Sequence, residues 1–310
     1  MSPTDGSPTR SPPVDPDTVA APEFLPDPTL SRAEMESLQR ELAATATFAD
    51  DHAIEPAAVA IDEPADLTDG LPPARANASD ADSRIDPDRP AGPDPNAPVV
   101  VGVDQAFLTP EDGADRAVSA AVAVRDGVVT EYASATTPLS IPYIPGLLAF
   151  REGEPVLAAL DALDAEPDLL VCDGSGRIHF REAGIATHVG VLLDVPSVGV
   201  AKSLLCGDPD ESTEERPEGW RTPVRADDSV ETAAARSAAD SDDAPVIGHA
   251  FQSRQYPNSR RVNPLYVSPG HRVSAETTVG LTDALCAGYK LPEPTRLADA
   301  SADAAKRERD

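Results

Sequence analysis

Apolar residues recur along this chain in two rhythms, which predict where strands and helices form. Uninterrupted runs rich in β-branched residues indicate buried strands, because a strand covered on both faces is apolar at every position. Such runs lie at residues 98–107, 167–174, 197–201, 245–252 and 264–271. The segment 117–136 predicts two more strands around Asp126 and Gly127, since Asp-Gly is a hairpin turn signal. A sheet is therefore the centre of the predicted fold.

Four segments show the helical rhythm instead. Met35, Leu38 and Leu42 recur at intervals of three and four residues, which predicts an amphipathic helix over about 31–47. Three further helices are expected over residues 155–163, 184–193 and 274–288. A meander of early strands followed by alternating helices and strands predicts an α/β fold, with a mixed sheet covered by helices.

Proline, serine and aspartate dominate the segments outside these elements. Residues 1–28 are expected to be a disordered acidic tail, because they contain too few apolar residues to form a core. Two acidic insertions, at about 53–97 and 207–245, are predicted to be a solvated linker and an enlarged loop. The folded domain would then span residues 29–300, and residues 301–310 would form a short C-terminal tail.

The charge of the chain is strongly acidic. Its 310 residues include 54 Asp and Glu against 25 Lys and Arg, a formal net charge of −29, and only three of the basic residues are Lys. Concentrated salt screens the self-repulsion of such a surface, because the Debye length falls to about 3 Å at 1 M. We therefore interpret the chain as a protein of a salt-loaded cytoplasm. An ordinary acidic protein with a disordered tail is the alternative.

The cysteines and the apolar runs indicate the compartment. Cys172, Cys206 and Cys286 lie far apart and form no CxxC pair, which predicts a reduced, cytoplasmic chain without a zinc ribbon. No apolar run approaches the length of a membrane span, and the first residues lack the charged and apolar regions of a signal peptide. A monomer is expected, although no sequence feature determines the oligomeric state.

Acidic residues at predicted strand ends indicate a metal site. Asp104 ends the first strand, and Asp173 ends a buried strand before a Gly-Ser-Gly turn. Open α/β sheets bind ligands at the carboxyl ends of their strands, where Glu152 at the start of a helix could join the two aspartates. Such a group suits Mg²⁺, which can activate water for phosphodiester hydrolysis. The structural alternatives are that Glu152 caps its helix and that Asp173 is a turn residue.

Lys202, His179 and His271 could complete this site. Lys202 follows an apolar strand, where its charge requires an anionic partner such as a phosphate or a carboxylate. His271 is the better of the two histidines, because it follows a strand across a Pro-Gly turn and would again lie at a strand end. A single histidine is nevertheless more often structural than catalytic.

Two features could contact nucleic acid. Tyr143 lies between Pro142 and Pro145, and a rigid side chain on such a stiffened loop can wedge between stacked bases. By its residues alone, Tyr143 is more readily interpreted as a core tyrosine beside a tight turn. A second candidate for a phosphate-binding surface is the net-positive C-terminal part of the domain, which contains Arg254, Arg260, Arg261 and Arg272.

Five segments are long enough to compare with known families. They are GVDQAF, PYIPGLLAFREG, the run from PDLLVCDGSGRIHFREAG to VPSVGVAKSLLCG, YVSPGHR and GYKLPEPTRLAD. Together they resemble endonuclease V, the deoxyinosine-directed repair nuclease, from about residue 30 to 299 and with the acidic insertions between them. The resemblance implies an RNase H-like mixed sheet with helices on both faces.

The resemblance also implies a metal site and a substrate pocket. Mg²⁺, or Mn²⁺ in its place, would be held by Asp104, Glu152 and Asp173. His271 would be a further member of the metal site, with Lys202 and His179 close to the scissile phosphate and Tyr143 as the wedge. The lesion pocket would be formed mainly by the backbone around Gly146, Leu148, Gly174, Gly184 and Ala201.

The activity implied by the resemblance is the hydrolysis of deoxyinosine-containing DNA, single- or double-stranded, at the second phosphodiester bond 3′ to the lesion. Two positions depart from the family pattern beside the expected pocket: Ser175 replaces the usual His or Asn, and Phe180 replaces the Pro of HPR. Both affect the expected lesion selectivity more than the metal site. An inosine-specific endoribonuclease and a non-catalytic inosine- or nucleic-acid-binding module are the alternatives, because the sequence does not show whether a 2′-hydroxyl has room.

Overall fold

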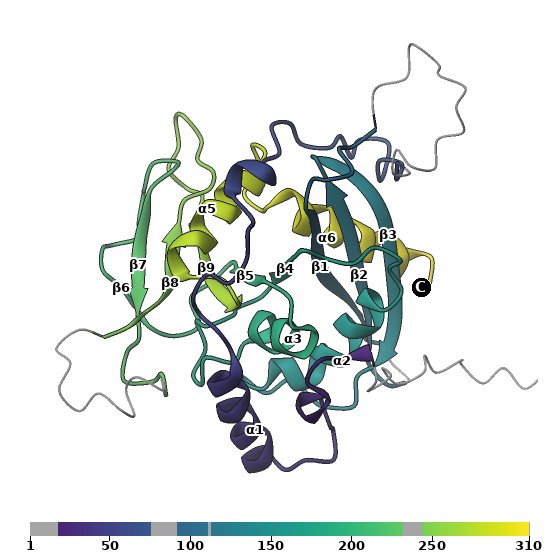
Figure 1. Cartoon of the computed structure of the whole chain (residues 1–310), viewed down its shortest axis with the longest axis vertical. Helices are drawn as coiled ribbons and strands as arrows, with labels where there is room; N and C mark the ends of the chain where they lie inside the picture. The colour runs from purple at the N-terminus through teal and green to yellow at the C-terminus, as the bar shows by residue number, and fades with distance from the viewer. Residues whose placement is uncertain (1–17, 76–91, 111–112, 232–243, 310) are drawn as a thin grey trace, which may run out of the picture.

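The computed structural model describes residues 18–75, 92–110, 113–231 and 244–309. Within these residues the chain forms one nine-stranded mixed sheet with helices on both faces, which confirms the predicted fold class (Figure 1). The strands are β1 (Val99–Leu108), β2 (Arg116–Arg125), β3 (Val128–Pro138), β4 (Leu169–Asp173), β5 (Ser197–Ala201), β6 (Asp208–Pro209), β7 (Arg221–Arg225), β8 (Val246–Phe251) and β9 (Leu265–His271). The α-helices are α1 (Arg32–Thr45), α2 (Leu148–Leu160), α3 (Ile185–Leu193), α5 (Ala275–Leu285) and α6 (Glu293–Arg307). Two 3-10 helices, η2 (Pro22–Phe24) and η3 (Pro56–Ala58), precede the first strand.

Parallel pairing at the centre of the sheet places two aspartates side by side. The strand order is β3-β2-β1-β4-β5-β9-β8-β7-β6, and β4 pairs in parallel with both β1 and β5. The pairing of β1 with β4 ends at Val103 and Cys172. Asp104 and Asp173 are the next residues of these two strands, which lie about 4.8 Å apart in a sheet. β1 itself continues beyond Asp104, because its antiparallel pairing with β2 extends to Leu108.

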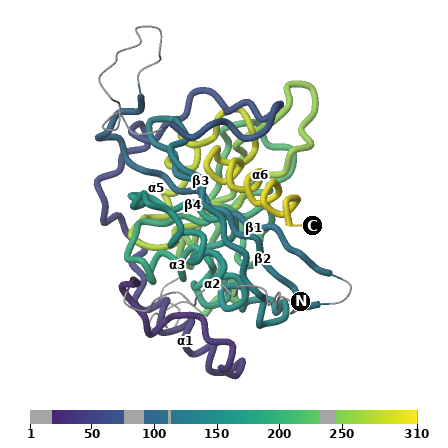
Figure 2. The backbone as a smooth tube through the Cα atoms, turned by 90° about the vertical axis from the view of Figure 1, so that its right-hand side faces the viewer, coloured from purple at the N-terminus to yellow at the C-terminus, as the bar shows by residue number. Residues whose placement is uncertain are grey.

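Two apolar layers enclose the sheet. One cluster of buried side chains joins β1 to α2 and α3, and the other joins β4 and β5 to α5 and α6. In Figure 2, α5 and α6 lie above α2 and α3, and α1 lies below them. Burial of both faces explains why the central strands are apolar at nearly every position, as the sequence indicated.

Gly102 allows α6 to approach the backbone of β1. A Cβ at this position would collide with the backbone of Pro294, in the first turn of α6. Asp104 lies two residues further along the same face of β1, because side chains alternate along a strand. The close packing of α6 on β1 therefore brings the α6 layer next to the strand end that carries Asp104.

Two predicted helix boundaries were wrong. The helix predicted over 155–163 begins at Leu148, so Pro155 lies inside α2 instead of starting it. The buried side chains Ala149 and Phe150 pack in the first turn and outweigh the local signal of the proline. The predicted tail at 301–310 is mostly the last part of α6. No helix was predicted after residue 288, although Pro292 and Pro294 are well tolerated at the start of a helix.

Parts of the low-complexity segments pack on the core, so their predictions are corrected. Phe24 is buried and its carbonyl oxygen lies 2.6 Å from His188 Nε2, so residues 18–28 belong to the fold. Val59 and Ile61 are buried against the layer of α5 and α6, and β7 lies inside the insertion predicted as a loop. Single apolar residues among Pro and Asp carry no periodic signal, which is why they were missed. The predictions for residues 1–17, 76–91 and 232–243 lie outside the described residues.

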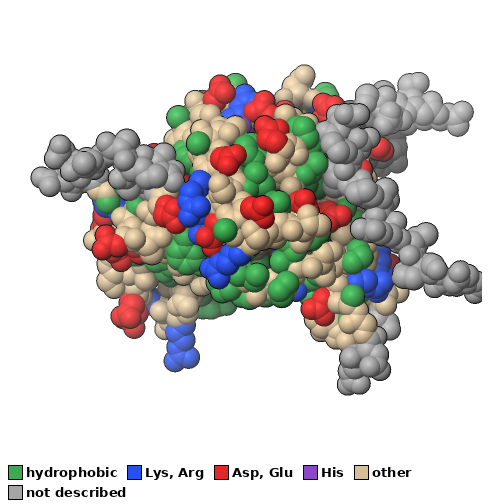
Figure 3. Space-filling model, turned by 90° about the horizontal axis from the view of Figure 1, so that it is seen from below, with side chains coloured by type: hydrophobic (Ala, Val, Ile, Leu, Met, Phe, Trp, Pro, Cys, Tyr) green, Lys and Arg blue, Asp and Glu red, His purple; other side chains and the backbone are tan. Residues whose placement is uncertain are grey.

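Charged side chains of both signs are interspersed on the surface. The face seen from below in Figure 3 shows acidic and basic side chains side by side, without one dominant acidic patch. Arg40 on α1, for example, pairs with Glu231 at 2.7 Å. The three cysteines are free thiols, and burial raises the pKa of each to about 12. Within the described residues, no helix is both long and apolar enough to cross a membrane.

The stability of this fold should depend on pH through two buried histidines. Burial lowers the pKa of His188 to about 4 and that of His179 to about 3, from the ordinary value of 6.5. Between about pH 6.5 and 4 each of these two side chains binds more protons in the unfolded chain than in the folded one, so their contribution to the free energy of unfolding falls as the pH is lowered. Burial raises the pKa of Asp104 to about 8 and that of Glu152 to about 7, which acts in the opposite direction over this range. Each histidine contributes up to about 1.4 kcal/mol per pH unit.

Urea unfolding at a series of pH values from 7 to 5, at constant high KCl, would measure this effect. The buried carboxyls are the same in the wild-type protein and in His188→Gln, so the difference between the two unfolding midpoints reports on His188 alone. The wild-type midpoint should fall relative to that of the variant as the pH is lowered. A difference that stays constant from pH 7 to pH 5 would contradict the prediction.

Candidate active site

Two aspartates and a lysine meet where the parallel strands end. Asp104 and Asp173 are the first residues after the last pair of the β1–β4 ladder, and Lys202 is the first residue after β5. Lys202 Nζ donates to Asp173 Oδ2 at 2.9 Å. The anionic partner that the sequence required for Lys202 is thus a carboxylate of the predicted metal site.

Negative charge in this cluster exceeds what Lys202 balances. Burial, followed by the charge of Asp173, raises the pKa of Asp104 to about 8. Burial lowers the pKa of Lys202, but the hydrogen bond to Asp173 and the charges of both aspartates outweigh it and leave that pKa above its ordinary value. A proton on Asp104 therefore relieves the repulsion near neutral pH, and a divalent cation could take the place of that proton.

Glu152 lies close enough to feel the same charges. It is the fifth residue of α2, whose N-cap is Leu147, so the alternative of a helix-capping role is wrong. Burial raises the pKa of Glu152 to about 7, although Arg151, whose Nη1 lies 3.4 Å from the carboxylate, opposes this, and the charge of Asp173 adds to the rise. Gln105 Nε2 donates to the Glu152 carbonyl oxygen at 3.2 Å, which ties this part of α2 to β1.

A fourth acidic residue, Asp299, was missed by the sequence analysis. It lies on α6 five residues after Pro294, and its charge contributes to the raised pKa values of Asp104 and Lys202. Asp299 is exposed, in contrast to Asp104. It stands in the family-like segment GYKLPEPTRLAD, but no helix was predicted there, so nothing placed its carboxylate beside the strand ends. The close contact of Gly102 with α6 is what brings it there.

The donor chemistry fits a hard divalent cation. Mg²⁺ usually keeps several waters and binds through one or two carboxylates together with substrate phosphates. Asp104 and Asp173 form such a carboxylate pair, and their mutual repulsion is the kind of strain that a cation would relieve. Among the residues that the structure describes, no three His, Cys, Asp or Glu side chains form a group that could hold a metal ion. The three-carboxylate grouping of Asp104, Glu152 and Asp173 therefore stays a prediction.

His271 does not belong to this cluster. It is the last residue of β9, but β9 runs antiparallel to β5, so His271 pairs with Ser197 at the start of β5. The carboxyl end of β9 therefore lies at the opposite end of the strands from Asp173. There His271 Nε2 lies 3.2 Å from Asp194 Oδ1, and His271 Nδ1 accepts from the backbone N–H of Thr47. The structure therefore does not bring His271 to the predicted metal site, because a sequence shows that a strand ends, but not in which direction it runs.

His179 contacts the loop that carries Tyr143. His179 is buried, and its Nε2 lies 3.2 Å from the carbonyl oxygen of Gly146, three residues after Tyr143. Because burial lowers the pKa of His179 to about 3, the ring is neutral at physiological pH. His179 is therefore not an imidazolium that could act as an acid toward a phosphate. Within the structure His179 supports the loop, and proximity to the scissile phosphate stays a prediction.

Tyr143 is exposed rather than buried. Its side chain is 66% exposed, the largest value among the exposed large apolar side chains, so the alternative of a core tyrosine is wrong. The loop around it is nevertheless anchored, because Ile141 and Leu147 are buried in a cluster with Met35 and Phe150. A rigid loop with an exposed aromatic tip is the geometry that a wedge between bases requires.

The residues predicted to line a lesion pocket have a packing function in the structure. A Cβ on Gly174 would collide with Ile185, and one on Gly184 would collide with the carbonyl oxygen of Ser175. Leu148 starts α2 and Ala201 ends β5, both half-buried, and Gly146 has a positive φ of 80°. The glycines thus allow the turn after β4 to pack tightly on α3, and the use of the same backbone as a base pocket stays a prediction.

The two departures from the family pattern lie next to these positions. The Ser175 carbonyl oxygen accepts a hydrogen bond from Ala186 at the start of α3. Phe180 packs beside Gly146, where a Cβ on the glycine would lie 3.1 Å from the ring. Phe180 is thus a neighbour of the Tyr143 loop and does not touch the carboxylates.

Known proteins share both the sequence and the fold of this chain. The Endonuclease V family model matches residues 87–300. The chain is 52% identical to Endonuclease V of Natronomonas pharaonis and to that of Haloarcula marismortui, in each case over 92% of this chain and 96% of the relative. The catalytic domain of human Endonuclease V has a TM-score of 0.62 at 27% identity and covers 89% of this chain and 96% of its own.

Two further solved structures of Endonuclease V share the fold of this chain. Endonuclease V of Streptomyces avermitilis is 31% identical, with a TM-score of 0.59, 90% of this chain covered and 94% of its own. Endonuclease V of Ciona intestinalis, in complex with a 24mer DNA containing an inosine followed by a ribo-adenosine, shares the fold at 23% identity, with a TM-score of 0.59, 90% of this chain covered and 98% of its own. The family model and the relatives at 52% identity each cover more than two thirds of this chain, and this chain belongs to the Endonuclease V family.

Proposed function

We propose that this chain is a Mg²⁺-dependent endonuclease that cuts DNA at the second phosphodiester bond 3′ to a deoxyinosine and leaves a 3′-hydroxyl and a 5′-phosphate. The observation that carries the proposal is the pair Asp104 and Asp173 where the β1–β4 pairing ends, since burial and then the charge of Asp173 raise the pKa of Asp104 to about 8. Membership of a family of nucleases gives this pair its chemistry, and the Ciona relative bound to an inosine-containing strand indicates the substrate.

Asp104 and Asp173 would hold the cation, with Glu152 near them. When bound, Mg²⁺ supplies the activation of a water molecule and the neutralisation of charge on the phosphate; Mn²⁺ would serve in its place. Lys202, which balances Asp173 in the structure, carries an ammonium group at the same edge and would orient a phosphate oxygen of the strand. The carboxylates would bind the cation and Lys202 a phosphate oxygen, so together they would favour a phosphodiester that also contacts the cation.

Recognition of the lesion would occur at the loop of Tyr143. Extruding a base costs a few kcal/mol, and least for a mispaired base such as hypoxanthine. Tyr143, exposed on its anchored loop, would fill the space left in the strand. The extruded base would then be read by the backbone of the glycine-rich turn after β4.

A matched set of substrates tests the proposed function. The purified protein would be assayed with Mg²⁺ in concentrated KCl on single strands of DNA and of RNA. For each nucleic acid, one strand contains an inosine and a second strand of otherwise identical sequence contains none. Cleavage of the inosine-containing DNA at the second bond 3′ to the lesion is expected, and inosine-free DNA should stay intact. Failure to cut inosine-containing DNA under these conditions would contradict the proposal.

An inosine-specific endoribonuclease is the second candidate. The observation in its favour is the ribo-adenosine that follows the inosine in the strand bound by the Ciona relative. Faster cleavage of the RNA member of the substrate pair would support this candidate. Binding of both strands without cleavage of either would instead indicate a non-catalytic module. We place the enzyme in the cytoplasm as a monomer, and sedimentation at high KCl would test the oligomeric state.

Activity should persist at molar KCl. The formal charge of −29 repels DNA at low ionic strength, and salt screens this repulsion because the Debye length at 1 M is only about 3 Å. The haloarchaeal relatives at 52% identity support this interpretation of the charge. A salt titration of the cleavage rate should show a maximum at molar KCl. A maximum at low salt, with inhibition at molar KCl, would contradict the prediction.

A further inference from the structure

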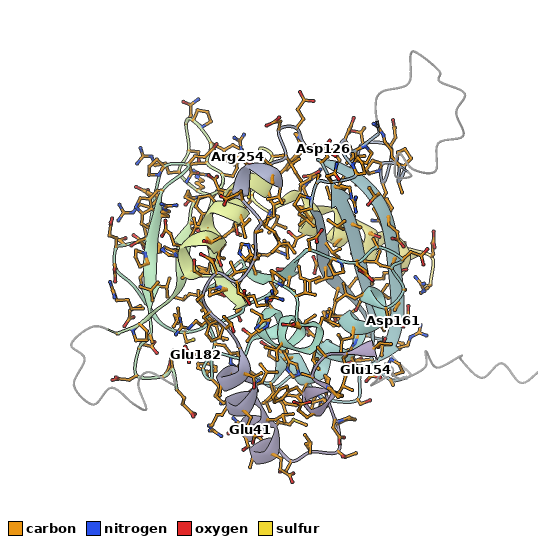
Figure 4. All side chains as sticks on the ribbon, in the orientation of Figure 1. Glu41, Asp126, Glu154, Asp161, Glu182 and Arg254 are labelled. Carbon is orange, nitrogen blue, oxygen red and sulfur yellow. The ribbon has the colours of Figure 1, made fainter. Side chains whose placement is uncertain are left out.

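A cavity of about 670 Å³ lies outside the carboxylate cluster and has no part in the proposed function. It is lined by Tyr256, Tyr289, Arg254, Lys290, Val262 and Asp62, among others. Tyr256 is 57% exposed and Tyr289 49%, which is unusual for large aromatic side chains. Arg254 lies at the end of the molecule opposite α1 (Figure 4).

The loop that carries Tyr256 is held by two buried glutamines. Gln252 Nε2 donates to the carbonyl oxygens of Arg254 and Val262, at 2.7 and 2.8 Å. Gln255 Oε1 accepts from the N–H groups of Tyr256 and Val262. Both glutamines are almost fully buried, so the loop is braced from inside while the ring of Tyr256 stays in solvent. The backbone that carries Tyr256 therefore needs little further ordering when a ligand binds.

The ring of Tyr289 is contacted by a guanidinium. The guanidinium of Arg296 lies 4.3 Å from the centre of its ring, and that guanidinium is fixed in turn by Glu293 at 2.7 Å. Tyr289 is half exposed, so its ring has room for a second planar group. Arg254 approaches Tyr256 more loosely, at 6.0 Å from the ring centre.

Lys290, which lines the cavity, lies near enough to Lys202 for the two charges to interact. Lys290 follows Tyr289, and burial together with the nearby charge of Lys202 lowers its pKa. The backbone on both sides of the cavity is tied together, because Ser253 Oγ donates to the Lys290 carbonyl oxygen at 2.6 Å. Lys202 in turn contacts Asp173, so the lysine whose charge acts on Lys290 belongs to the carboxylate cluster.

We propose that this cavity is a second nucleotide-binding subsite, in which a base of the substrate strand stacks on Tyr289 and Tyr256 while its phosphate lies near Lys290. Stacking on aromatic side chains beside a basic groove is the usual way in which proteins hold single-stranded nucleic acid without reading its sequence. The subsite rests on the proposed function, since its ligand is the same strand that is cut. It would hold the strand in register while Tyr143 and the carboxylates act on their own nucleotides.

Single-turnover cleavage of the inosine-containing DNA separates the two functions. The variant Tyr289→Ala should raise the half-saturating enzyme concentration by roughly 5- to 100-fold, the range expected for one lost stacking contact, and leave the maximal rate within about twofold. Tyr256→Ala should act in the same direction. Tyr289→Phe keeps the ring and should behave as the wild type, which makes it the matched control.

A scan of abasic nucleotides along the strand identifies the base. Removing one base at a time should weaken binding by the wild-type protein at one or two positions away from the inosine. Those positions should cause no further loss in Tyr289→Ala, because the stacking partner is already absent. Unchanged half-saturation in Tyr289→Ala, or a loss that remains at every abasic position, would overturn the subsite. Cleavage by the wild-type protein in the same assay reports separately on the proposed function.

A second inference comes from a different cluster, around the carbonyl oxygen of Gly146. Gln39 on α1 is fully buried, and its Nε2 donates to this oxygen at 2.9 Å. Arg181 Nη2 donates to the same oxygen at 3.1 Å, and His179 Nε2 lies 3.2 Å from it. Gln39 Oε1 accepts from Arg181 Nε at 2.6 Å, which closes the network.

We infer that Gln39 is a positioning residue for the loop of Tyr143, a role that the proposed function does not assign to α1. Gln39 lies outside residues 87–300, which the family model matches. Three polar groups directed at one carbonyl oxygen fix the residue at which this loop turns into α2, and Gly146 has the positive φ that such a turn requires. The N-terminal helix would thus keep Tyr143 in the orientation in which it can enter a strand.

A double-mutant cycle distinguishes positioning from a general loss of stability. Gln39→Ala should lower the maximal cleavage rate by about tenfold, and Tyr143→Ala in the same protein should cause little further loss, because both changes remove one contact with the strand. Two losses that multiply would show that Gln39 acts independently of Tyr143 and would overturn the inference. Arg32→Ala, on the exposed side of the same helix, is the matched control and should leave the rate unchanged.

Discussion

Replacing Asp104 or Asp173 by alanine should abolish strand cleavage and leave binding of the inosine-containing strand measurable. These two carboxylates are the pair that the structure brings together at the ends of the parallel strands, and burial and mutual repulsion raise the pKa of Asp104 to about 8. A metal ion supplies several kcal/mol of transition-state stabilisation, so its loss should reduce the cleavage rate by about 10³-fold or more. Removing one charge of the pair should not weaken binding of a polyanion.

Thermal unfolding provides a readout that does not depend on activity. Mg²⁺ should raise the unfolding temperature of the wild-type protein and have little effect on either variant, because a ligand stabilises only the state that binds it. Asp161→Ala, at the exposed end of α2, is a matched control and should behave as the wild type (Figure 4). Full Mg²⁺-dependent cleavage by Asp104→Ala or Asp173→Ala would refute the assignment of the site.

The second large effect is expected at Asp299, with His271 as its counterpart. The charge of Asp299 acts on both Asp104 and Lys202, so Asp299→Asn should lower the cleavage rate by about 10- to 100-fold, as is typical for partners of metal-binding residues. His271→Asn should leave the rate within about threefold, because this residue lies at the other edge of the sheet. It should instead lower the unfolding temperature, since it breaks the contacts with Asp194 and Thr47.

Measuring the two variants side by side makes the comparison decisive. Both substitutions remove one titratable side chain and keep a polar one, so a general effect on folding would change both rates in proportion to stability. The reverse result, a normal rate for Asp299→Asn and a strongly reduced rate for His271→Asn, would show that the active site forms at the opposite edge.

Most of the sheet follows from local patterns. The apolar runs predicted β1, β4 and β5 close to their observed bounds, and the Asp-Gly signal located the turn between β2 and β3. A strand that is buried on both faces is apolar at nearly every position, so it can be recognised from its own sequence without knowledge of its neighbours. Asp173 ends β4 and Lys202 follows β5, as the sequence indicated, whereas Asp104 lies where the pairing of β1 with β4 ends and β1 continues to Leu108. Lys202 contacts Asp173, and the charges of both groups act on Asp104.

The remaining site residues depended on contacts between distant segments. Asp299 acts at the strand ends only because α6 packs on Gly102, and the sequence around Pro292 and Pro294 gave no sign of a helix. Gln39 meets Gly146 across 107 residues of chain, which no periodicity can show. Tyr143 could be a core or a surface residue by its local sequence, and the packing of the flanking Ile141 and Leu147 decided that it is exposed.

The sequence by itself thus determined the type of each central element and the residues at which the strands end, because hydrophobic periodicity is a property of a short segment. Only the tertiary structure decided which ends meet. His271 and Asp173 both end a strand, but β9 runs against β5 while β4 runs with it, so one residue lies away from the carboxylates and the other among them. Strand direction is fixed by pairing across the whole sheet, and the free energy of that pairing is spread over residues far apart in the chain.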